Sequence, residues 1–369
     1  MRIACISAAQ IPSDTANSIQ VMKVCQAFAQ LGHVVTLLVP GNQEVTISNQ
    51  QLIEHYGLEH LFNIEWLSFY SRRLFPWKAV RKVRRLGADL LYAWPLQSAA
   101  LGLLAGFPTM LELHDFPKGH VGPIWLRLFL TIPGRKRLLP ITEALRHALD
   151  LPQKQTVIAP DGVDLERYAL LPDPASARCT LGLPKAPTVL CTGHLYVGRG
   201  ADLFLGLAAK FPQSSFVWVG GRQVDLGIWK ERAAGLTNVT FTGFMPNERI
   251  PLYQSAADVL LMPYGRTVAT SSGGNTAEIC SPMKMFEYMA AGRAILSSDL
   301  PVLREVLDDT MAVFCPTDDA GAWESALGGL LADPHQRQSL GQSARVAVDQ
   351  YSWVRRAQRL LEGFYEISP

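Results

Sequence analysis

Short apolar runs alternate with helix-length segments along the chain, and this alternation restricts the fold more than any other feature. The first forty residues read as a strand at 3–7, a helix at about 16–30 and a second strand at 34–39. Parallel strands joined in this way need a helix that crosses the face of the sheet. Further strand candidates follow at 89–92, 109–113, 138–141 and 156–158. The pattern predicts a doubly wound parallel α/β sheet.

A second alternation begins at Thr188, after a segment rich in Pro, Ala and Asp. A chain of 369 residues exceeds the size that one hydrophobic core usually serves. We therefore predict two Rossmann-like domains that face a central cleft. The expected parts are an N-terminal domain at 1–166, a linker at 167–186, a C-terminal domain at 187–350 and a last helix at 351–369 that crosses back to the first domain. Strand candidates of the second domain are 188–191, 215–219, 259–261, 294–297 and 311–314.

Composition excludes several classes of protein. A net charge of +2 gives no general reason to expect nucleic-acid binding. The six cysteines show no metal-finger spacing and are expected to be buried and reduced. The longest apolar stretch, near 99–107, is too short to span a bilayer, and the N-terminus lacks the pattern of a signal peptide. These features predict a cytoplasmic protein.

The segment SPMKMFEYMAAG at 281–292 carries the strongest chemical signal. Ser281 and Pro282 suit the start of a helix, and Gly292 suits its end. Lys284 and Glu287 are three residues apart and therefore share one face. A helix start beside a lysine binds anions, and a carboxylate one turn later can accept hydrogen bonds from ribose hydroxyls. This reading suggests a nucleotide site, whereas the alternative is a capped amphipathic helix with a solvated Lys–Glu pair.

This segment resembles the donor-binding helix of the family-4 retaining glycosyltransferases of the GT-B fold. Three other segments resemble parts of that family in the same order: CTGHLYVGRGADLFL at 191–205, VIAPDGVDLERY at 157–168 and FTGFMPNERIPLYQSAADVLLMPY at 241–264. The resemblance covers nearly the whole chain. It implies an enzyme that takes a nucleotide-sugar as donor.

The resemblance also assigns roles in the donor site. Gly193 would lie close to the pyrophosphate, Arg199 would bind phosphate, and Glu287 would bind the ribose. Two positions depart from the family: Ile279 stands where the first family glutamate is expected, and His194 stands where many relatives carry arginine. Lys284 and the backbone near Ser281 are expected to replace part of the lost contacts. The donor-binding set is Gly193, His194, Arg199, Arg222, Phe244, Ser281, Lys284 and Glu287.

The N-terminal domain is expected to serve the acceptor. In LELHDFP, His114 and Asp115 end a strand, where His114 can bond a sugar or acceptor hydroxyl and Asp115 can orient it. Asn17 and Ser18 would present N–H groups at a helix start. The glycine-containing loop 271–278 is either a ligand-approach loop or a plain surface loop. The residues expected to act in the reaction are His114, Arg199, Lys284 and Glu287.

Cleavage of a sugar–phosphate bond develops negative charge on the departing nucleoside diphosphate, which fixed cations and N–H dipoles stabilise. We find no Asp-x-Asp pair after a strand and no His, Asp and Glu group with ligand spacing, so the prediction includes no metal and no cofactor beyond a UDP- or GDP-sugar. The resemblance implies a retaining hexosyltransferase for a glycan or lipid-linked acceptor in cell-surface polysaccharide or glycoconjugate synthesis. Two alternatives stay open, namely a nucleotide-sugar epimerase of the same fold and a non-catalytic nucleotide-sugar-binding relative.

Residues 71–87 contain seven basic side chains and no acidic one. On a helical wheel, Trp77, Val80, Val83 and Leu86 share one half, opposite most of the cations. Such a helix can lie on an anionic membrane as a peripheral contact. A core-facing helix with a solvated basic face explains the pattern equally well.

Overall fold

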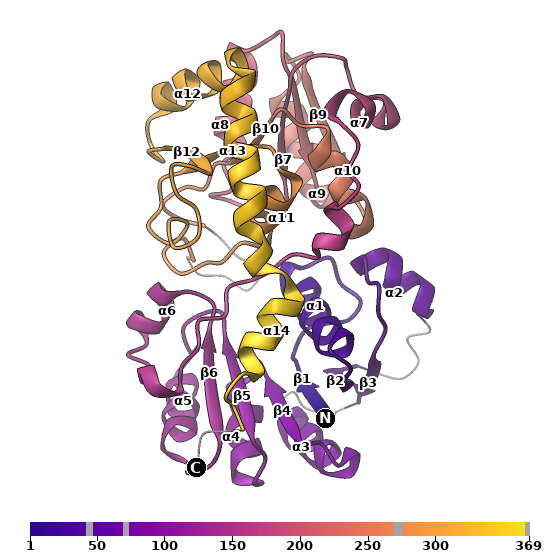
Figure 1. Cartoon of the computed structure of the whole chain (residues 1–369), viewed down its shortest axis with the longest axis vertical. Helices are drawn as coiled ribbons and strands as arrows, with labels where there is room; N and C mark the ends of the chain where they lie inside the picture. The colour runs from indigo at the N-terminus through magenta and orange to yellow at the C-terminus, as the bar shows by residue number, and fades with distance from the viewer. Residues whose placement is uncertain (42–46, 69–73, 269–275, 366–369) are drawn as a thin grey trace. The chain divides into compact units, whose positions relative to one another are not determined.

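The computed structural model describes residues 1–41, 47–68, 74–268 and 276–365. The chain forms two compact units, Met1–Asp161 with Trp353–Pro369, and Gly162–Ser352 (Figure 1). The sequence places the first boundary at 166 instead. The segment 167–186, expected as a linker, is part of the second unit, where Asp173 caps helix α7 (Pro174–Leu181) through its carboxylate.

The first unit is built on a six-stranded parallel sheet of order β3-β2-β1-β4-β5-β6. Its central strands are mostly apolar and buried, as expected when helices cover both faces of a sheet. The strands are β1 (Arg2–Ile6), β2 (Val34–Pro40), β3 (Asn63–Leu67), β4 (Leu90–Ala93), β5 (Thr109–Leu113) and β6 (Lys136–Pro140).

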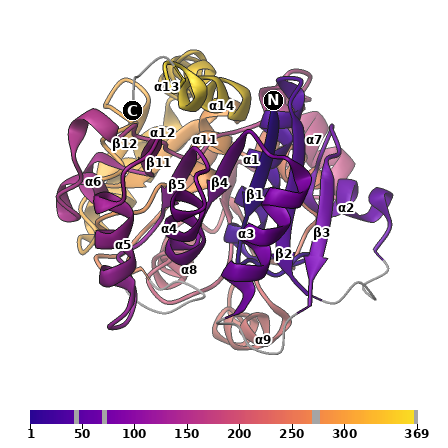
Figure 2. The same ribbon diagram turned by 90° about the horizontal axis from the view of Figure 1, so that it is seen from below.

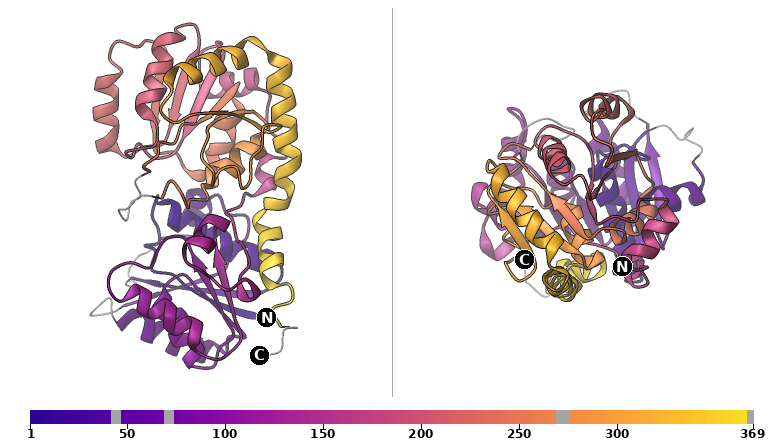
Figure 3. Two further views of the ribbon diagram at one scale, coloured as in Figure 1. Left: turned by 90° about the vertical axis from the view of Figure 1, so that its left-hand side faces the viewer. Right: turned by 90° about the horizontal axis from the view of Figure 1, so that it is seen from above.

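Alternating side chains of this sheet pack against two different layers of helices. Ala4 and Leu91 lie in one cluster with residues of α3 and α4, whereas the ring of Tyr92 meets Phe28 of α1. Helices α3, α4 and α5 lie side by side (Figure 2). The C-terminal helix α14 packs beside α1 (Figure 3). The helices are α1 (Ala16–Gln30), α2 (Asn49–Tyr56), α3 (Phe75–Leu86), α4 (Leu96–Leu104), α5 (Gly122–Thr131), α6 (Glu143–Ala148) and α14 (Trp353–Leu361).

The second unit repeats this plan with a six-stranded parallel sheet of order β12-β11-β10-β7-β8-β9. Its strands are β7 (Thr188–Thr192), β8 (Ser215–Val219), β9 (Val239–Gly243), β10 (Val259–Met262), β11 (Ala294–Ser298) and β12 (Ala312–Cys315). Its further helices are α8 (Ala201–Lys210), α9 (Gln223–Arg232), α10 (Ile250–Ser255), α11 (Met283–Ala291), α12 (Ala320–Ala332) and α13 (Pro334–Ala347).

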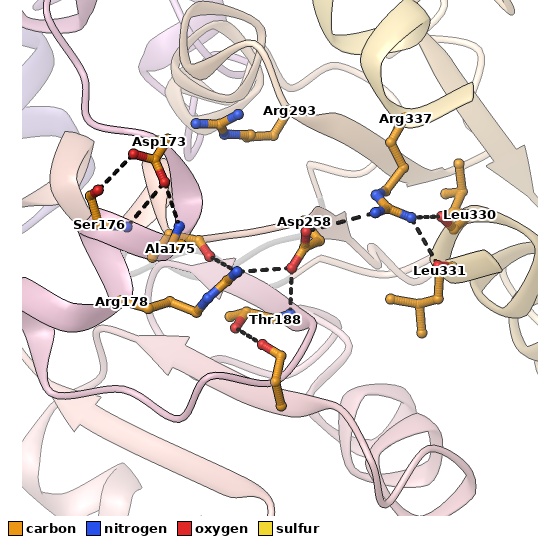
Figure 4. Close-up of polar contacts among 12 residues, drawn as sticks. Asp173, Ala175, Ser176, Arg178, Thr188, Asp258, Arg293, Leu330, Leu331 and Arg337 are labelled. Carbon is orange, nitrogen blue, oxygen red and sulfur yellow. Dashed lines mark hydrogen bonds and ion pairs between the residues drawn. The ribbon is translucent and has the colours of Figure 1, made fainter. Parts of the chain in front are cut away.

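Asp258 ties the elements of the second unit together where β7 and β10 begin (Figure 4). Its carboxylate accepts from Arg178 of α7 at 2.9 Å and from the backbone N–H of Thr188 at 2.8 Å. Arg337 of α13 lies 3.9 Å away. These side chains are mostly buried, so the carboxylate offsets guanidinium charge that would otherwise be desolvated without a partner.

Three sequence expectations about the elements were wrong. Residues 156–158 form no strand, because Thr156 makes only an isolated bridge to Leu138. The edge strands β3 and β9 were missed, since their half-exposed and partly polar residues make no continuous apolar run. Cys179 is exposed and Cys280 is half-buried, whereas the other four cysteines are buried, and all six are free.

None of the described helices combines the length and the apolar character needed to cross a bilayer.

Candidate functional site

Arg199 and Lys284 converge on the side chain of Tyr264 in the second unit. Arg199 follows β7, Tyr264 follows β10, and Lys284 lies in the first turn of α11. Arg199 Nη1 donates to the Tyr264 hydroxyl at 2.7 Å, and its guanidinium lies 4.9 Å from the ring centre. Lys284 Nζ lies 4.8 Å from the same ring. The two cations expected to bind phosphate are therefore brought together, at the strand ends where α/β sheets bind ligands.

Neutral groups hold both cations. Lys284 Nζ donates to the Thr192 carbonyl at 2.9 Å and approaches Cys191 Sγ at 3.7 Å. Within the ranges that the structure describes, neither Arg199 nor Lys284 forms an ion pair with a carboxylate. The solvated Lys284–Glu287 pair considered from the sequence is therefore not formed, and two uncompensated positive charges create a place for an anion.

Glycine residues allow the loop after β7 to pass close to its neighbours. A Cβ at Gly198 would lie 1.7 Å from the Thr267 carbonyl oxygen, and one at Gly200 would lie 2.0 Å from that of Pro263. Gly193 has a φ of +122°, and a Cβ there would lie 3.9 Å from Lys284 Nζ. The Gly193 N–H donates to the Val219 carbonyl, so its contribution is space beside the lysine rather than a spare donor.

Glu287 points to a different set of partners. Its Oε2 accepts from Gln254 Nε2 at 3.1 Å, and Gln254 Oε1 in turn accepts from the Tyr168 hydroxyl at 2.8 Å. Burial raises the pKa of Tyr168 well above its ordinary value, and the charge of Glu287 adds to this effect. Glu287 is only partly buried, and one turn of α11 carries both the Lys284 ammonium and this ordered carboxylate.

The remaining donor-site candidates lie around the same loops. The rings of His194 and Tyr196 stack at 4.9 Å, and the Arg222 guanidinium lies 5.1 Å from the Tyr196 ring. Arg222 also pairs with Asp225 at 2.8 Å, so its charge is already matched. Phe244 is 41% exposed, which leaves an aromatic surface after β9.

The start of α11 differs from the sequence expectation. The helix begins at Met283, with Pro282 as its cap residue and no side-chain cap bond, so Ser281 is not the N-cap. Ser281 is buried, and Ile279, which stands where the resemblance expects a glutamate, is buried as well. Residues 271–275 of the glycine-containing loop lie outside the described residues.

In the first unit, His114 is oriented by Glu112 and not by Asp115. His114 Nε2 lies 2.7 Å from Glu112 Oε1, whereas Asp115 pairs with Lys118 at 2.9 Å. Strand alternation explains the correction, because residues two apart point to the same side and adjacent residues do not. The Glu-x-His spacing was the signal that the sequence reading missed.

The start of α1 does not offer a ligand the Ser18 N–H group that the sequence analysis expects there. The Ser18 N–H donates to Thr15 within the helix cap, and Ser18 is fully buried, so it presents no N–H to a ligand. Asn17 is exposed.

Glu112, His114 and Asp161 form a group that the sequence reading did not find, with potential ligand atoms within 4.8 Å of one another. Arg356 Nη2 donates to Glu112 Oε1 at 2.8 Å. A guanidinium on the carboxylate repels a second cation, so the donor set does not suit a metal ion. Asp161 is buried, and its pKa is raised to about 6 mainly by that burial.

Comparison with known proteins finds similarity to one family. Residues 186–333 match the family model described as Glycosyl transferases group 1. The chain is 30% identical over 219 residues to a GDP-mannose-dependent alpha-(1-6)-phosphatidylinositol monomannoside mannosyltransferase of Mycolicibacterium smegmatis, covering 55% of this chain and 54% of that protein. It thus spans about half the length of that relative. Identity to a phosphatidyl-myo-inositol mannosyltransferase of the same organism is 27%, over 90% of this chain and 85% of the relative.

Solved structures share the architecture over nearly the whole chain. Sucrose-phosphate synthase from Thermosynechococcus elongatus matches with a TM-score of 0.76 and 19% identity, over 99% of this chain and 98% of that one. Anabaena HepE, solved in complex with UDP, matches with a TM-score of 0.76 and 15% identity, over 100% of both chains.

The two doubly wound parallel sheets and these structural matches define a protein of the GT-B fold. The sequence prediction of the fold class is confirmed. Within the second unit, residues 186–333 are similar to the glycosyl transferases group 1.

Proposed function

We propose that this chain is a glycosyltransferase that moves a hexosyl unit from a UDP- or GDP-sugar to a glycan or lipid-linked acceptor, with retention of configuration and without a metal ion. The observation that carries the proposal is the pair of cations, Arg199 and Lys284, held on Tyr264 by neutral groups only. A diphosphate is the anion whose charge and size suit two adjacent cations at the ends of parallel strands.

The same pair of cations would also stabilise the transition state of sugar transfer. When the sugar–phosphate bond breaks, negative charge grows on the departing diphosphate. Arg199 and Lys284 are already held in place by the Tyr264 hydroxyl and the Thr192 carbonyl. Cations that need no rearrangement stabilise the transition state without a reorganisation cost. Glu287 completes the proposed site by accepting from the ribose hydroxyls, a role that would compete with its bond to Gln254.

The relatives favour a lipid-linked acceptor. One is named as GDP-mannose-dependent, and both mannosyltransferases carry a phosphatidylinositol compound in their names. Anabaena HepE was solved with UDP-glucose as well as UDP. We therefore place the chain in cell-surface glycoconjugate or polysaccharide synthesis, with GDP- and UDP-sugars as the first donors to test.

The donor is identified by a thermal-shift screen against UDP-, GDP-, ADP- and dTDP-sugars in the presence of EDTA. A ligand at 100 times its dissociation constant adds about 2.7 kcal/mol to the free energy of unfolding. We expect one of these nucleotides to raise the melting temperature of the wild type. No shift with any of the four sugars would contradict the proposal.

Product analysis then separates this function from the two alternatives. NMR of the glycoside formed from the best donor is expected to show transfer with the anomeric configuration of the donor. An epimerase instead turns the nucleotide-sugar over without an acceptor. A non-catalytic relative binds the donor in calorimetry and yields neither transfer nor slow donor hydrolysis.

The exposed face of α3 supports a peripheral contact with an anionic membrane on its cytoplasmic side. Val80 and Val83 are buried in the core of the first unit, so they are not available to insert into lipid. Trp77, predicted on the same side, is instead 58% exposed. It lies beside an exposed set of cations on α3: Lys78, Arg81, Arg84 and Arg85. Residues 71–73 of the basic segment lie outside the described residues.

Each cation near an anionic surface contributes about 1 kcal/mol of binding, and an exposed Trp anchors at the headgroup level. Liposome flotation is expected to carry the wild type upward with vesicles that contain anionic lipid, but not with neutral ones. An Arg81→Glu, Arg85→Glu variant should stay at the bottom of the gradient. Arg232→Glu, an exposed cation on α9, is the matched control and should float like the wild type.

A further inference from the structure

A buried network in the first unit ends at His114. Glu112 is the second-last residue of β5, and its side chain is fully buried. An isolated buried carboxylate is too costly to persist unless other groups compensate its charge. Arg356 of α14 supplies the opposite charge at 2.8 Å, and Tyr92 and Gln20 donate hydrogen bonds. The network therefore joins α1, β4, β5 and α14.

Arg356 is fixed as firmly as the carboxylate it meets. Its side chain is 2% exposed. Its Nε donates to the Pro160 carbonyl at 2.8 Å, and its Nη2 donates to the Ala159 carbonyl at 3.1 Å. It also lies within 3.4 Å of the Tyr92 hydroxyl. With most of its donors used, the guanidinium holds Glu112 ionised and in one position.

His114 is the one member of this ion-pair network with substantial exposure, at 31% of its side chain. An ionised carboxylate only accepts hydrogen bonds, so the 2.7 Å contact requires a proton on His114 Nε2. In the neutral imidazole, Nδ1 is then the nitrogen that accepts. Without Glu112 the ring would be free to exchange tautomers and to rotate.

We infer that Glu112 and Arg356 are positioning residues for His114, which fix its Nε2–H tautomer and present Nδ1 as the functional nitrogen. The inference rests on the proposed function together with the sequence expectation that His114 bonds a sugar or acceptor hydroxyl. Its geometric basis is the chain of contacts from Arg356 through Glu112 to the imidazole. The last helix of the chain thereby sets the chemistry at the end of β5.

The charges around His114 agree with this arrangement. Burial alone would lower the pKa of His114, but the hydrogen bond and charge of Glu112 and the charge of Asp161 outweigh it, so the pKa lies above its ordinary value. Arg356 acts in the opposite direction on the imidazole. Burial works to raise the pKa of Glu112, yet the charge of Arg356 and the contacts with His114 keep it below its ordinary range.

The test is ¹⁵N NMR of the histidine rings in the full-length protein, with His114 assigned from a His114→Gln variant. Above its pKa, wild-type His114 is expected to carry its proton on Nε2, and an Nδ1–H tautomer or an averaged mixture would overturn the inference. Apart from the His114→Gln variant used for assignment, this spectrum needs no substitution in the network and no enzyme activity. It therefore separates failure of the inference from failure of the proposed function.

A Glu112→Gln variant tests whether Glu112 sets the pKa and the tautomer of His114. Because burial persists while the negative charge is lost, the pKa of His114 should fall, and the activity-versus-pH profile should move in the same direction. We expect kcat to fall about tenfold, the size of one charge-assisted hydrogen bond, with the KM for the donor within about twofold of the wild type. Tyr92→Phe removes a bond to Glu112 without removing charge and should keep the His114 pKa and tautomer. A His114 pKa that is the same in Glu112→Gln and wild type contradicts the assignment.

Discussion

Lys284→Met should weaken binding of the donor nucleotide strongly while leaving the fold unchanged. The Lys284 ammonium has three N–H donors and gives one to the Thr192 carbonyl at 2.9 Å and one to Cys191 Sγ at 3.7 Å, so one remains for a diphosphate. A hydrogen bond to a charged group contributes about 1.5–3 kcal/mol. Its loss corresponds to a dissociation constant raised about 10- to 150-fold. Met keeps the aliphatic stem, which limits any packing loss beside Tyr264.

Isothermal titration with the best nucleotide from the donor screen measures this change directly. Lys210→Met is the matched control, because Lys210 is 62% exposed on α8 of the same unit and lies 3.7 Å from Glu324. The control should bind like the wild type, and all three proteins should melt at similar temperatures without ligand. Equal affinity of Lys284→Met and wild type would refute the assignment of this cation to the diphosphate.

The remaining predictions concern stability. Asp258→Ala leaves mostly buried guanidinium groups and the Thr188 N–H without their acceptor, which should cost about 2–4 kcal/mol and lower the melting temperature by about 5–15 °C in a unit of this size. Asp318→Ala breaks an ion pair in which the Arg266 side chain is 76% exposed and the Asp318 side chain 65% exposed, and it should change calorimetric stability by less than about 0.5 kcal/mol. Equal effects of Asp258→Ala and Asp318→Ala would contradict the role given to Asp258. The pKa of buried Asp161 is raised to about 6, so the folded state holds its proton more tightly than the unfolded state, and the contribution of Asp161 to wild-type stability should fall from about pH 4 to about pH 6. Asp161→Asn should remove this fall, so in urea titrations its free energy of unfolding relative to the wild type should rise by roughly 2–3 kcal/mol from pH 4 to pH 7. A difference that does not depend on pH would argue against a raised pKa of Asp161.

The fold was largely predictable because its information is local. Buried parallel strands are continuous apolar runs, and the crossover rule leaves few ways to connect them. The helix expected at about 16–30 occurs as α1 at Ala16–Gln30. The edge strands β3 and β9 escaped because half-exposed strands lose the continuous apolar pattern.

The candidate site was only partly predictable, since long-range partners leave no local signal. Arg199 and Lys284 could be selected from glycine spacing and helix position, but nothing near them in sequence points to Tyr264 as their common support. Asp115 was expected to orient His114 because it follows it in sequence, whereas the extended backbone at the end of β5 makes Glu112, two positions earlier, the neighbour of His114 in space. Arg356, 244 positions from Glu112, had no sequence signal at all.

The charged side chains at the ends of the two sheets differ in how their charge is compensated. In the second unit, Arg199 and Lys284 are held by a hydroxyl, a carbonyl and an aromatic ring, so their charge is left uncompensated within the described residues. In the first unit, the charge of Glu112 is fully matched inside the protein by Arg356, and only a neutral or singly charged imidazole reaches solvent. An uncompensated cation pair favours a dianionic ligand, whereas a matched charge with an ordered imidazole favours an uncharged hydroxyl. This contrast supports the proposal that the diphosphate binds to the second unit and the sugar or acceptor hydroxyl to the first.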